Sequence, residues 1–238
     1  MYLLDIHTHS IASGHGSTDT IADLARAAVA KGLKLLGVSD HAPSTMCAGT
    51  TSYFRGLVMA PRHRLGMELL YGVELNILDY AGHIDLDTAT LSSLDYAIAS
   101  IHRPNLRPGN IKQNTSAYIG AMKNPYVSVI GHCDDARYPV DYDALVKEAV
   151  HSHVLLEINN SSLSPDGYRG DTRDNVRRIM HLCKAARHPV LLSSDSHGTE
   201  HVGDFSYIEP FLKECRFPES LVINHSPAAL KRFLIREC

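Results

Sequence analysis

The chain has 238 residues, of which 44% are hydrophobic, and its formal net charge at pH 7 is −3. This length suits one large α/β domain, and the apolar fraction is ordinary for a protein that folds around a core. The small net charge and the absence of a long Lys/Arg tract argue against a nucleic-acid or membrane-surface protein. No apolar run approaches the roughly 18 residues needed to cross a bilayer, so we expect neither a membrane span nor a signal peptide.

Short apolar segments recur along the chain, spaced roughly 25–35 residues apart, as strands of an α/β protein do. Apart from the first, they are mostly continuous apolar runs, which is typical of strands buried on both faces of a parallel sheet. The predicted strands are residues 2–6, 34–39, 68–75, 96–101, 126–130, 154–158 and 190–194, with 221–224 as a candidate eighth.

Amphipathic helices are expected between several of these strands, because apolar residues recur there at helical spacing. Thr20, Asp141 and Thr172 are the predicted caps of three helices, and Ser226-Pro227 opens a fourth. The inward-facing residues are expected to be Ile21, Leu24, Ala25, Ala28, Val29, then Leu145, Val146, Ala149, Val150, then Val176, Ile179, Met180, Cys183, and finally Leu230, Phe233, Leu234. The polar segment 109–116 is expected to be a surface loop.

Alternating strands and helices predict a parallel α/β architecture. Seven or eight such units in a chain of this length indicate a single-domain barrel, with a doubly wound open sheet as the alternative. No linker, low-complexity segment or internal repeat divides the chain.

The five cysteines are odd in number and form no C-x-x-C pair. Such a set is typical of reduced thiols, so we expect a cytoplasmic protein without a disulfide framework. Histidine is unusually abundant at 15 residues, and many of these lie beside Asp, Glu or another His.

Residue types that bind metals follow most of the predicted strands. Residues two apart point to the same face of a strand, so His7 and His9 would project together. In a parallel barrel the carboxyl ends of the strands share one face, which carries the active site. The candidate ligands at these ends are His7, His9, His15, His41, Glu74, His102, His132, Asp195 and His197.

A single histidine is more often a packed or surface residue than a ligand. His151-Ser152-His153 repeats the spacing of the first pair but precedes a strand, so we predict that it binds no metal. His63, His181 and His188 fall in helices or at strand beginnings and are interpreted as structural. His83, His201 and His225 are ambiguous and are left out of the predicted site.

Nine ligands are more than one metal ion coordinates. A zinc site uses three or four protein ligands, so nine suit two or three ions. Imidazole and carboxylate without thiolate favour Zn, Mn or Fe over Ca or Mg. Neighbouring cations require anionic bridges, for which Glu74 and Asp195 are the candidates.

At these residues the chain resembles the PHP (polymerase and histidinol phosphatase) superfamily over nearly its whole length, and within it the YcdX-type phosphatases. The segments that carry the resemblance are Asp5-Ile6-His7-Thr8-His9-Ser10, Ser39-Asp40-His41, Glu157-Ile158-Asn159-Asn160-Ser161-Ser162 and Ser193-Ser194-Asp195-Ser196-His197.

The resemblance implies one PHP domain over residues 1–238, folded as a distorted seven-stranded, TIM-like (β/α)7 barrel, with a trinuclear and usually zinc centre. By the same resemblance, one ion would be held by His7, His9, Glu74 and Asp195, a second by Glu74, His102 and His132, and a third by His15, His41 and His197. Two residues next to predicted ligands differ from the pattern of the family. Cys133 replaces an expected Pro, and Arg103 replaces an expected acidic residue. Arg103 would help to hold an anionic substrate.

The predicted reaction is hydrolysis of a small phosphomonoester by a metal-bridging hydroxide, without a protein nucleophile. Asp40 is predicted to orient an imidazole ligand. Arg103, Asn159 and Asn160 are the predicted substrate contacts, with packing or turn formation as the equal alternative for the two asparagines. Arginine forks suit phosphate, so Arg169 or Arg173 could serve besides Arg103, but for these two solvated surface charge is the favoured interpretation.

Four alternatives remain open. Histidinol-phosphate phosphatase would differ only in its substrate pocket, and a phosphodiesterase or exonuclease would be expected to show a basic stripe. An amidohydrolase acting on a C–N bond often uses a bridging lysine, which no strand end supplies here. A non-enzymatic metal store or sensor would not need ligands from six strand ends. The physiological alcohol and the native metal are left open, and homo-oligomers are common among such barrels.

Overall fold

The structure is a computed structural model that describes residues 1–234, and its centre is a nearly closed barrel of seven parallel strands. In order around the barrel these are β1 (Leu4–Asp5), β2 (Leu35–Val38), β4 (Met67–Asn76), β5 (Tyr96–Ser100), β6 (Val127–Ile130), β7 (Leu155–Asn159) and β8 (Val190–Ser193). Each strand pairs in parallel with the next. The predicted single-domain, distorted (β/α)7 barrel is confirmed. A short β3 (His63–Arg64) pairs antiparallel with β4 outside this path.

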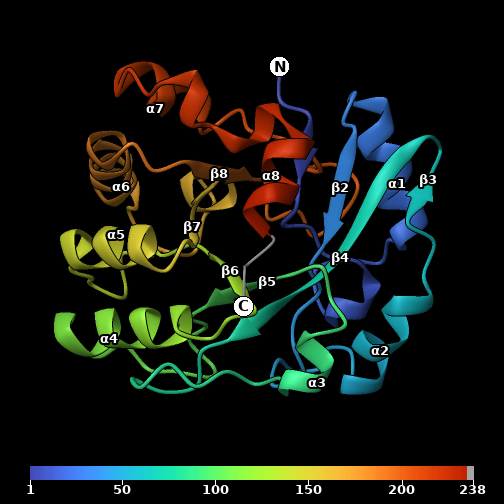
Figure 1. Cartoon of the computed structure of the whole chain (residues 1–238), viewed down its shortest axis with the longest axis horizontal. Helices are drawn as coiled ribbons and strands as arrows, with labels where there is room; N and C mark the ends of the chain where they lie inside the picture. The colour runs from blue at the N-terminus through green and yellow to red at the C-terminus, as the bar shows by residue number, and fades with distance from the viewer. Residues whose placement is uncertain (235–238) are drawn as a thin grey trace.

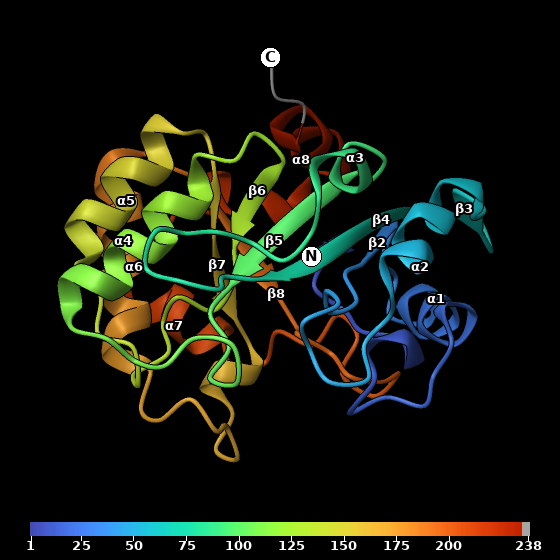
Figure 2. The same cartoon turned by 90° about the horizontal axis from the view of Figure 1, so that it is seen from below.

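Helices surround the barrel (Figures 1 and 2). They are α1 (Ile21–Ala30), α2 (Thr51–Gly56), α3 (Thr88–Leu91), α4 (Ile111–Met122), α5 (Tyr142–His151), α6 (Arg173–Ala186), α7 (Glu209–Glu214) and α8 (Pro227–Leu234). Figure 1 shows α4, α5 and α6 along one side, and α1 and α2 with β3 along the other. Short 3-10 turns at η1 (Ile11–Ser13), η2 (Leu57–Met59) and η3 (Ser161–Leu163) shape the loops. Among the described residues, no helix has the length and apolar character that crossing a bilayer requires.

Side chains close the seam between β8 and β1. The amide of Asn224 donates to the carbonyls of Leu4 and Leu192 at 3.0 and 2.7 Å, and its oxygen accepts from the Leu192 N–H. The buried carboxylate of Asp5 accepts from the backbone N–H and the hydroxyl of Ser194. Together with a single parallel bridge between Thr8 and Ser196, these bonds join β8 to β1, which do not pair as a ladder.

The expected eighth strand at 221–224 is wrong. The segment forms two 3-10 turns, η4 (Glu219–Leu221) and η5 (Ile223–His225). A single parallel bridge between Val190 and Val222 joins it to β8. The chain enters a new turn directly after Val222, so no ladder develops, and this turn carries Asn224 into the seam.

Three of the four predicted helix caps are confirmed. Thr20, Asp141 and Ser226 each accept a hydrogen bond from the backbone N–H three residues further on. Thr172 occupies the N-cap position of α6 but accepts no capping hydrogen bond there, and its hydroxyl donates to the Ser162 carbonyl at 3.0 Å. It ties the loop after β7 to the start of α6 instead.

Two further expectations about helices are wrong. The segment 109–116 is not a loop but contains the start of α4, where Asn110 and Gln113 form a capping box. Val29 and Val150 are 36% and 44% exposed, because they lie at the edges of the apolar stripes of α1 and α5.

Apolar side chains fill the lower interior of the barrel. Tyr96 enters it from β5, and its hydroxyl donates to the Ile6 carbonyl at 2.6 Å. Gly72 leaves room for this ring, because a Cβ there would lie 2.5 Å from Tyr96 Cζ. Leu4 and Leu35 complete this layer with 0% exposure. The packed interior leaves the carboxyl-terminal mouth as the place where polar groups gather.

Candidate metal centre

Glu74 lies at the centre of the polar cluster. It stands near the carboxyl end of β4, and only 1% of the residue is exposed. Its two carboxylate oxygens lie 2.7–3.6 Å from imidazole nitrogens of five histidines. The five are His7, His9, His41, His102 and His132. A single buried carboxylate thus faces imidazoles from four different strand ends.

Asp195 is the second carboxylate of the cluster. It follows β8, and its Oδ1 lies 3.5 Å from His7 Nε2 and 3.3 Å from His9 Nε2. Its Oδ2 accepts from the Arg169 guanidinium at 2.8 Å and from the Asn159 amide at 3.1 Å. One oxygen is therefore held by the protein while the other faces the imidazoles.

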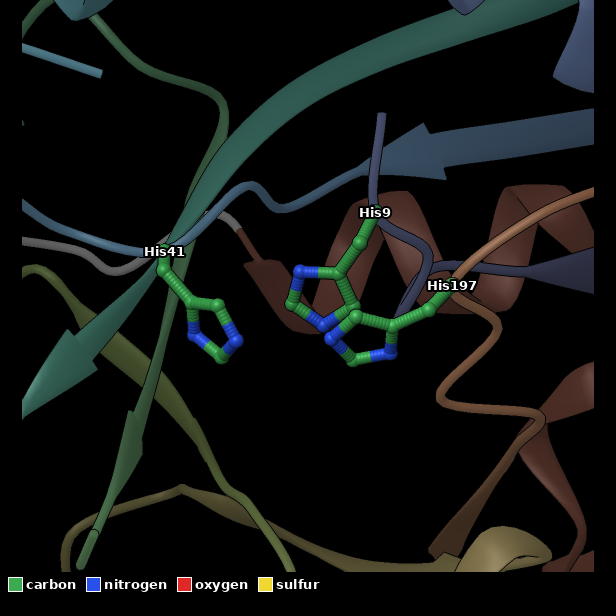
Figure 3. A group of neighbouring side chains, drawn as sticks. All are labelled: His9, His41 and His197. Atoms are coloured by element: carbon green, nitrogen blue, oxygen red, sulfur yellow. The ribbon is translucent and has the colours of Figure 1, made fainter. Parts of the chain in front are cut away.

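Three imidazoles form one wall of the site (Figure 3). The rings of His9 and His197 stack at 4.1 Å, and His41 lies 4.4 Å from His9 between ring centroids. His15 is exposed at the rim, with its ring 4.8 Å from His41 and nearly parallel to it. All nine predicted ligands thus lie at one mouth of the barrel, eight of them packed together and His15 at the edge.

The described residues contain three sets of side chains whose ligand atoms lie within 4.8 Å of one another. They are His7, His9 and Asp195, then His41, Glu74 and His102, and then His9, His41 and His197. The first agrees with part of one predicted ligand set. In the second, His41 stands where the resemblance implied His132, and in the third, His9 stands where it implied His15.

Several buried polar atoms in this cluster make no hydrogen bond to any described residue. They include His7 Nε2, His9 Nε2, His197 Nε2 and Glu74 Oε2. A buried polar atom without a partner costs about 1–3 kcal/mol. Several such atoms aimed at one another are the donor set of a cation site, so the residues present fit divalent metal ions.

The protonation states also favour cation binding. Burial alone would raise the pKa of Glu74, but His102, His7 and His41 lower it well below its ordinary value. Burial and the neighbouring His197 and His41 lower the pKa of His9 well below its ordinary value. Ionised carboxylate and neutral imidazole are the forms that bind metals.

Glu157 is a supporting residue to which the sequence interpretation gave no role, although it stands in a segment that carries the family resemblance. Its Oε1 accepts from His7 Nδ1 at 2.5 Å, and its Oε2 accepts from the backbone N–H of His132 at 2.6 Å. The first bond turns His7 Nε2 toward Glu74. The second holds His132 at a φ of 26°, a left-handed conformation that is strained for a residue other than glycine.

Two further contacts orient ligand rings. His102 Nδ1 lies 2.7 Å from the Asn76 side-chain oxygen, which leaves Nε2 facing Glu74. The Ser13 hydroxyl donates to Asp40 at 2.8 Å and lies 2.9 Å from His9 Nδ1. Asp40 therefore orients an imidazole as predicted, but through a serine.

The predicted substrate contacts fall in two different environments. Arg103 is exposed and lines the cavity above the cluster. Asn159 is buried and donates to Glu157 and Asp195. Asn160 accepts from the backbone of the segment before α7. Neither asparagine lines the cavity, so packing is the role that their contacts support.

The interpretation of Arg169 as solvated surface charge is wrong. The residue is 3% exposed, forms an ion pair with Asp195, and lines the cavity. Arg169 lies in the loop between η3 and α6, and its side chain reaches Asp195, a contact that local composition does not reveal. Arg173 is exposed and pairs with Asp171.

The other histidines lie away from this centre. His153 precedes β7, and its ring packs on Phe233 at 3.8 Å. His188 is buried, and its Nε2 donates to the Val154 carbonyl at 2.9 Å. His63 stands in β3 and His181 in α6.

The cavity above the cluster has a volume of about 680 Å³. Its lining includes six of the nine predicted ligands. They are the histidines His15, His41, His102, His132 and His197, together with Asp195. This volume lies within the range of small-molecule sites, roughly 300–1,000 Å³, so it has room for an organic group besides a phosphate.

The family model of the PHP domain matches residues 5–161. The chain belongs to the PHP domain family. The predicted resemblance is confirmed, whereas a domain boundary at residues 1–238 stays a prediction, because the match ends earlier.

Relatives match along almost the whole chain. A protein named probable phosphatase from Clostridium novyi is 39% identical over 98% of this chain and 94% of its own length. A probable phosphatase from Photobacterium profundum is 37% identical over 96% of this chain and 92% of its own length.

A solved structure shares the fold. Histidinol phosphate phosphatase from Lactococcus lactis, complexed with zinc, L-histidinol and phosphate, aligns with a TM-score of 0.64 at 17% identity. The alignment covers 91% of this chain and 95% of that one.

Proposed function

We propose that this PHP family member is a metal-dependent phosphatase that hydrolyses phosphomonoesters. The observation that carries the proposal is the buried Glu74, which faces five imidazoles beneath a cavity large enough for a phosphorylated metabolite. The names of the relatives from Clostridium and Photobacterium support the same activity.

We propose three divalent ions, most simply zinc, with the nine residues predicted from the sequence as their ligands. Zinc in the Lactococcus structure supports this choice of metal. When bound, such ions lower the pKa of water and neutralise phosphoryl oxygens. Glu74 and Asp195 supply the negative charge that lets cations lie close together.

The protein's own residues position these groups. Glu157 orients His7, Asn76 orients His102, and Arg169 holds one oxygen of Asp195. In our proposal Arg103, which is exposed in the cavity, binds the negatively charged substrate.

The serines beside the ligands support a mechanism without a protein nucleophile. The hydroxyl of Ser10 donates a hydrogen bond to Asp40, that of Ser194 to Asp5, and that of Ser196 to the Gly198 carbonyl. No imidazole accepts from these three hydroxyls, so none is activated for attack as a serine nucleophile would be.

The L-histidinol and phosphate named in the Lactococcus structure support a small phosphorylated substrate. Histidinol phosphate therefore remains the second candidate substrate. A shared fold does not distinguish histidinol phosphate from other phosphomonoesters, because enzymes of one fold act on many different substrates.

The proposal is tested with zinc-loaded protein on phenyl phosphate, histidinol phosphate and bis(4-nitrophenyl) phosphate. We expect turnover of monoesters, its loss in Glu74→Gln, and its retention in Glu68→Gln. Glu68 is the matched control, because it lies on the same strand but pairs with Lys231 at the other end of the barrel. Turnover of the diester alone would contradict the proposal and favour a nuclease. Metal binding without any turnover would favour storage or sensing.

We also propose a cytoplasmic location, because Cys47, Cys133, Cys183 and Cys215 are free thiols. Self-association stays a prediction that light scattering on the purified protein tests.

A further inference from the structure

Positively charged side chains outnumber negatively charged ones in the lining of the cavity. Arg103, Arg137 and Arg169 contribute guanidinium groups, whereas Asp195 is the only acidic residue in the described lining. Asp195 already forms an ion pair with Arg169 and faces the imidazoles of the metal centre. Arg103 thus has no acidic partner among the described residues, whereas Arg137 pairs with Asp135, which lies outside the cavity lining.

Both arginines are available to a ligand. Arg103 is exposed, and its side chain makes no hydrogen bond or ion pair with any described residue. Arg137 is held by the buried Asp135 through Nε and one terminal nitrogen, with bonds of 2.9 and 2.6 Å. Its other terminal nitrogen has no hydrogen bond to the described residues, so a fixed donor remains.

An aromatic ring stands beside these cations. Tyr168 is 64% exposed, yet its ring is held in place by the guanidinium groups of Arg137 and Arg169, at 5.2 and 4.9 Å from its centroid. Its hydroxyl also accepts from Arg169 at 3.1 Å. An exposed ring fixed in this way offers a flat surface to the organic part of a ligand.

We propose that the substrate carries a second negatively charged group on its leaving alcohol, and that Arg103 and Arg137 bind this group. The inference rests on the proposed phosphatase function, because it assigns the phosphate to the metal centre. A leaving group that bears an ammonium, as histidinol does, would meet two guanidinium groups and no free carboxylate. The cavity therefore selects an anionic leaving group over a cationic one.

Phosphonates that cannot be hydrolysed separate this inference from the reaction. The probes are 4-carboxybenzylphosphonate, the equally shaped neutral 4-carbamoylbenzylphosphonate, and 4-(aminomethyl)benzylphosphonate. Calorimetry with the zinc-loaded protein should give the carboxylate the lowest Kd, about fivefold to tenfold below that of the amide, because a charged group pairs with guanidinium. The ammonium probe should bind most weakly.

Variants assign the preference to these arginines. In Arg103→Gln/Arg137→Gln the Kd ratio of amide to carboxylate should fall to about one, whereas Arg107→Gln should keep it. Arg107 is an exposed arginine on the same loop that does not line the cavity. Circular dichroism and thermal melting check that each variant folds.

The outcomes are distinct. Equal affinity for the carboxylate and the amide, tighter binding of the ammonium probe, or failure of all three to bind overturns the inference. An unchanged Kd ratio in the double variant overturns the assignment to Arg103 and Arg137. A preference for the carboxylate together with no turnover of phenyl phosphate or 4-carboxyphenyl phosphate supports the anion site and overturns the proposed phosphatase function.

Discussion

The barrel carries a His-x-His pair at each of its ends, and the two pairs lie in opposite surroundings. At the carboxyl end, His7 and His9 face Glu74 and Asp195, and their Nε2 atoms are buried without a hydrogen-bond partner among the described residues. At the amino end, His153 is exposed and packs flat on Phe233.

The comparison shows that equal spacing does not place two histidine pairs in similar surroundings. What separates the two ends is convergence on a carboxylate. Strand ends bring residues far apart in sequence onto Glu74, whereas His153 belongs to a turn between α5 and β7 and meets an apolar ring. Four predictions test this contrast between the two ends of the barrel.

Removing one histidine from each end gives the largest contrast. His7→Ala should lower kcat by about a thousandfold, since losing several kcal/mol of metal-derived stabilisation has that effect. His153→Ala should keep kcat and lower the free energy of unfolding by about 1 kcal/mol, because it loses only ring packing. Steady-state kinetics and urea unfolding measure both. Equal loss of kcat in the two variants would remove the distinction between the ends.

Removing metal should destabilise the protein through the carboxyl end alone. Ligands that bind only the folded state stabilise it, by about 2.7 kcal/mol at a hundredfold excess over Kd. A chelator should therefore lower Tm in the wild type and in His153→Ala alike, and have little effect in Glu74→Gln. Calorimetric melting curves with and without chelator measure this. If the chelator left the Tm of the wild type unchanged, that result would contradict the proposed metal centre.

Glu157→Gln tests whether the hydrogen bond of Glu157 to the predicted ligand His7 contributes to metal affinity. The loss of the charged bond to His7 should weaken metal affinity by about 10–100-fold, as for other carboxylate–histidine pairs. Competition with a fluorescent zinc chelator measures the affinity without relying on activity. Glu148→Gln is the matched control, because Glu148 bonds to Ser152 near the amino-end pair. Its metal affinity should equal that of the wild type, and a comparable loss would refute a specific role of Glu157.

The smallest effect concerns pH and the amino end. Burial lowers the pKa of His188 below its ordinary value of 6.5. Below pH 6.5 the unfolded state therefore binds more protons than the folded state, so this histidine makes stability rise as pH increases toward 6.5. His188→Gln should reduce that rise by about 1 kcal/mol or less. Urea unfolding between about pH 5 and 7 measures it, and an unchanged slope would show that His188 does not contribute.

The strand ends were predictable from the sequence because parallel strands give continuous apolar runs. The nine predicted ligands follow from those ends, and the structure brings them all to one mouth. The burial of Arg169 was not predictable, since it depends on a contact with Asp195, which lies 26 residues further along the chain. Asn224 was missed for a related reason, because its side chain acts in a seam between the first and last strands.

Local signals were also overlooked. Asn110 and Gln113 are spaced as a capping box, and this spacing could have revealed the start of α4 within the expected loop. The roles of Glu157 and Ser13 depend on which rings they meet in space. Such contacts follow from the register of β7 and from the turn after β1, which sequence periodicity does not fix.

Anomalous diffraction from crystals of the zinc-loaded protein would locate the metal ions. We expect anomalous peaks within the ring of imidazoles around Glu74, with Glu74 or Asp195 bridging neighbouring ions. Peaks only at other sites, such as the pair at the amino end, or no ordered peak beside Glu74, would contradict the proposed metal centre.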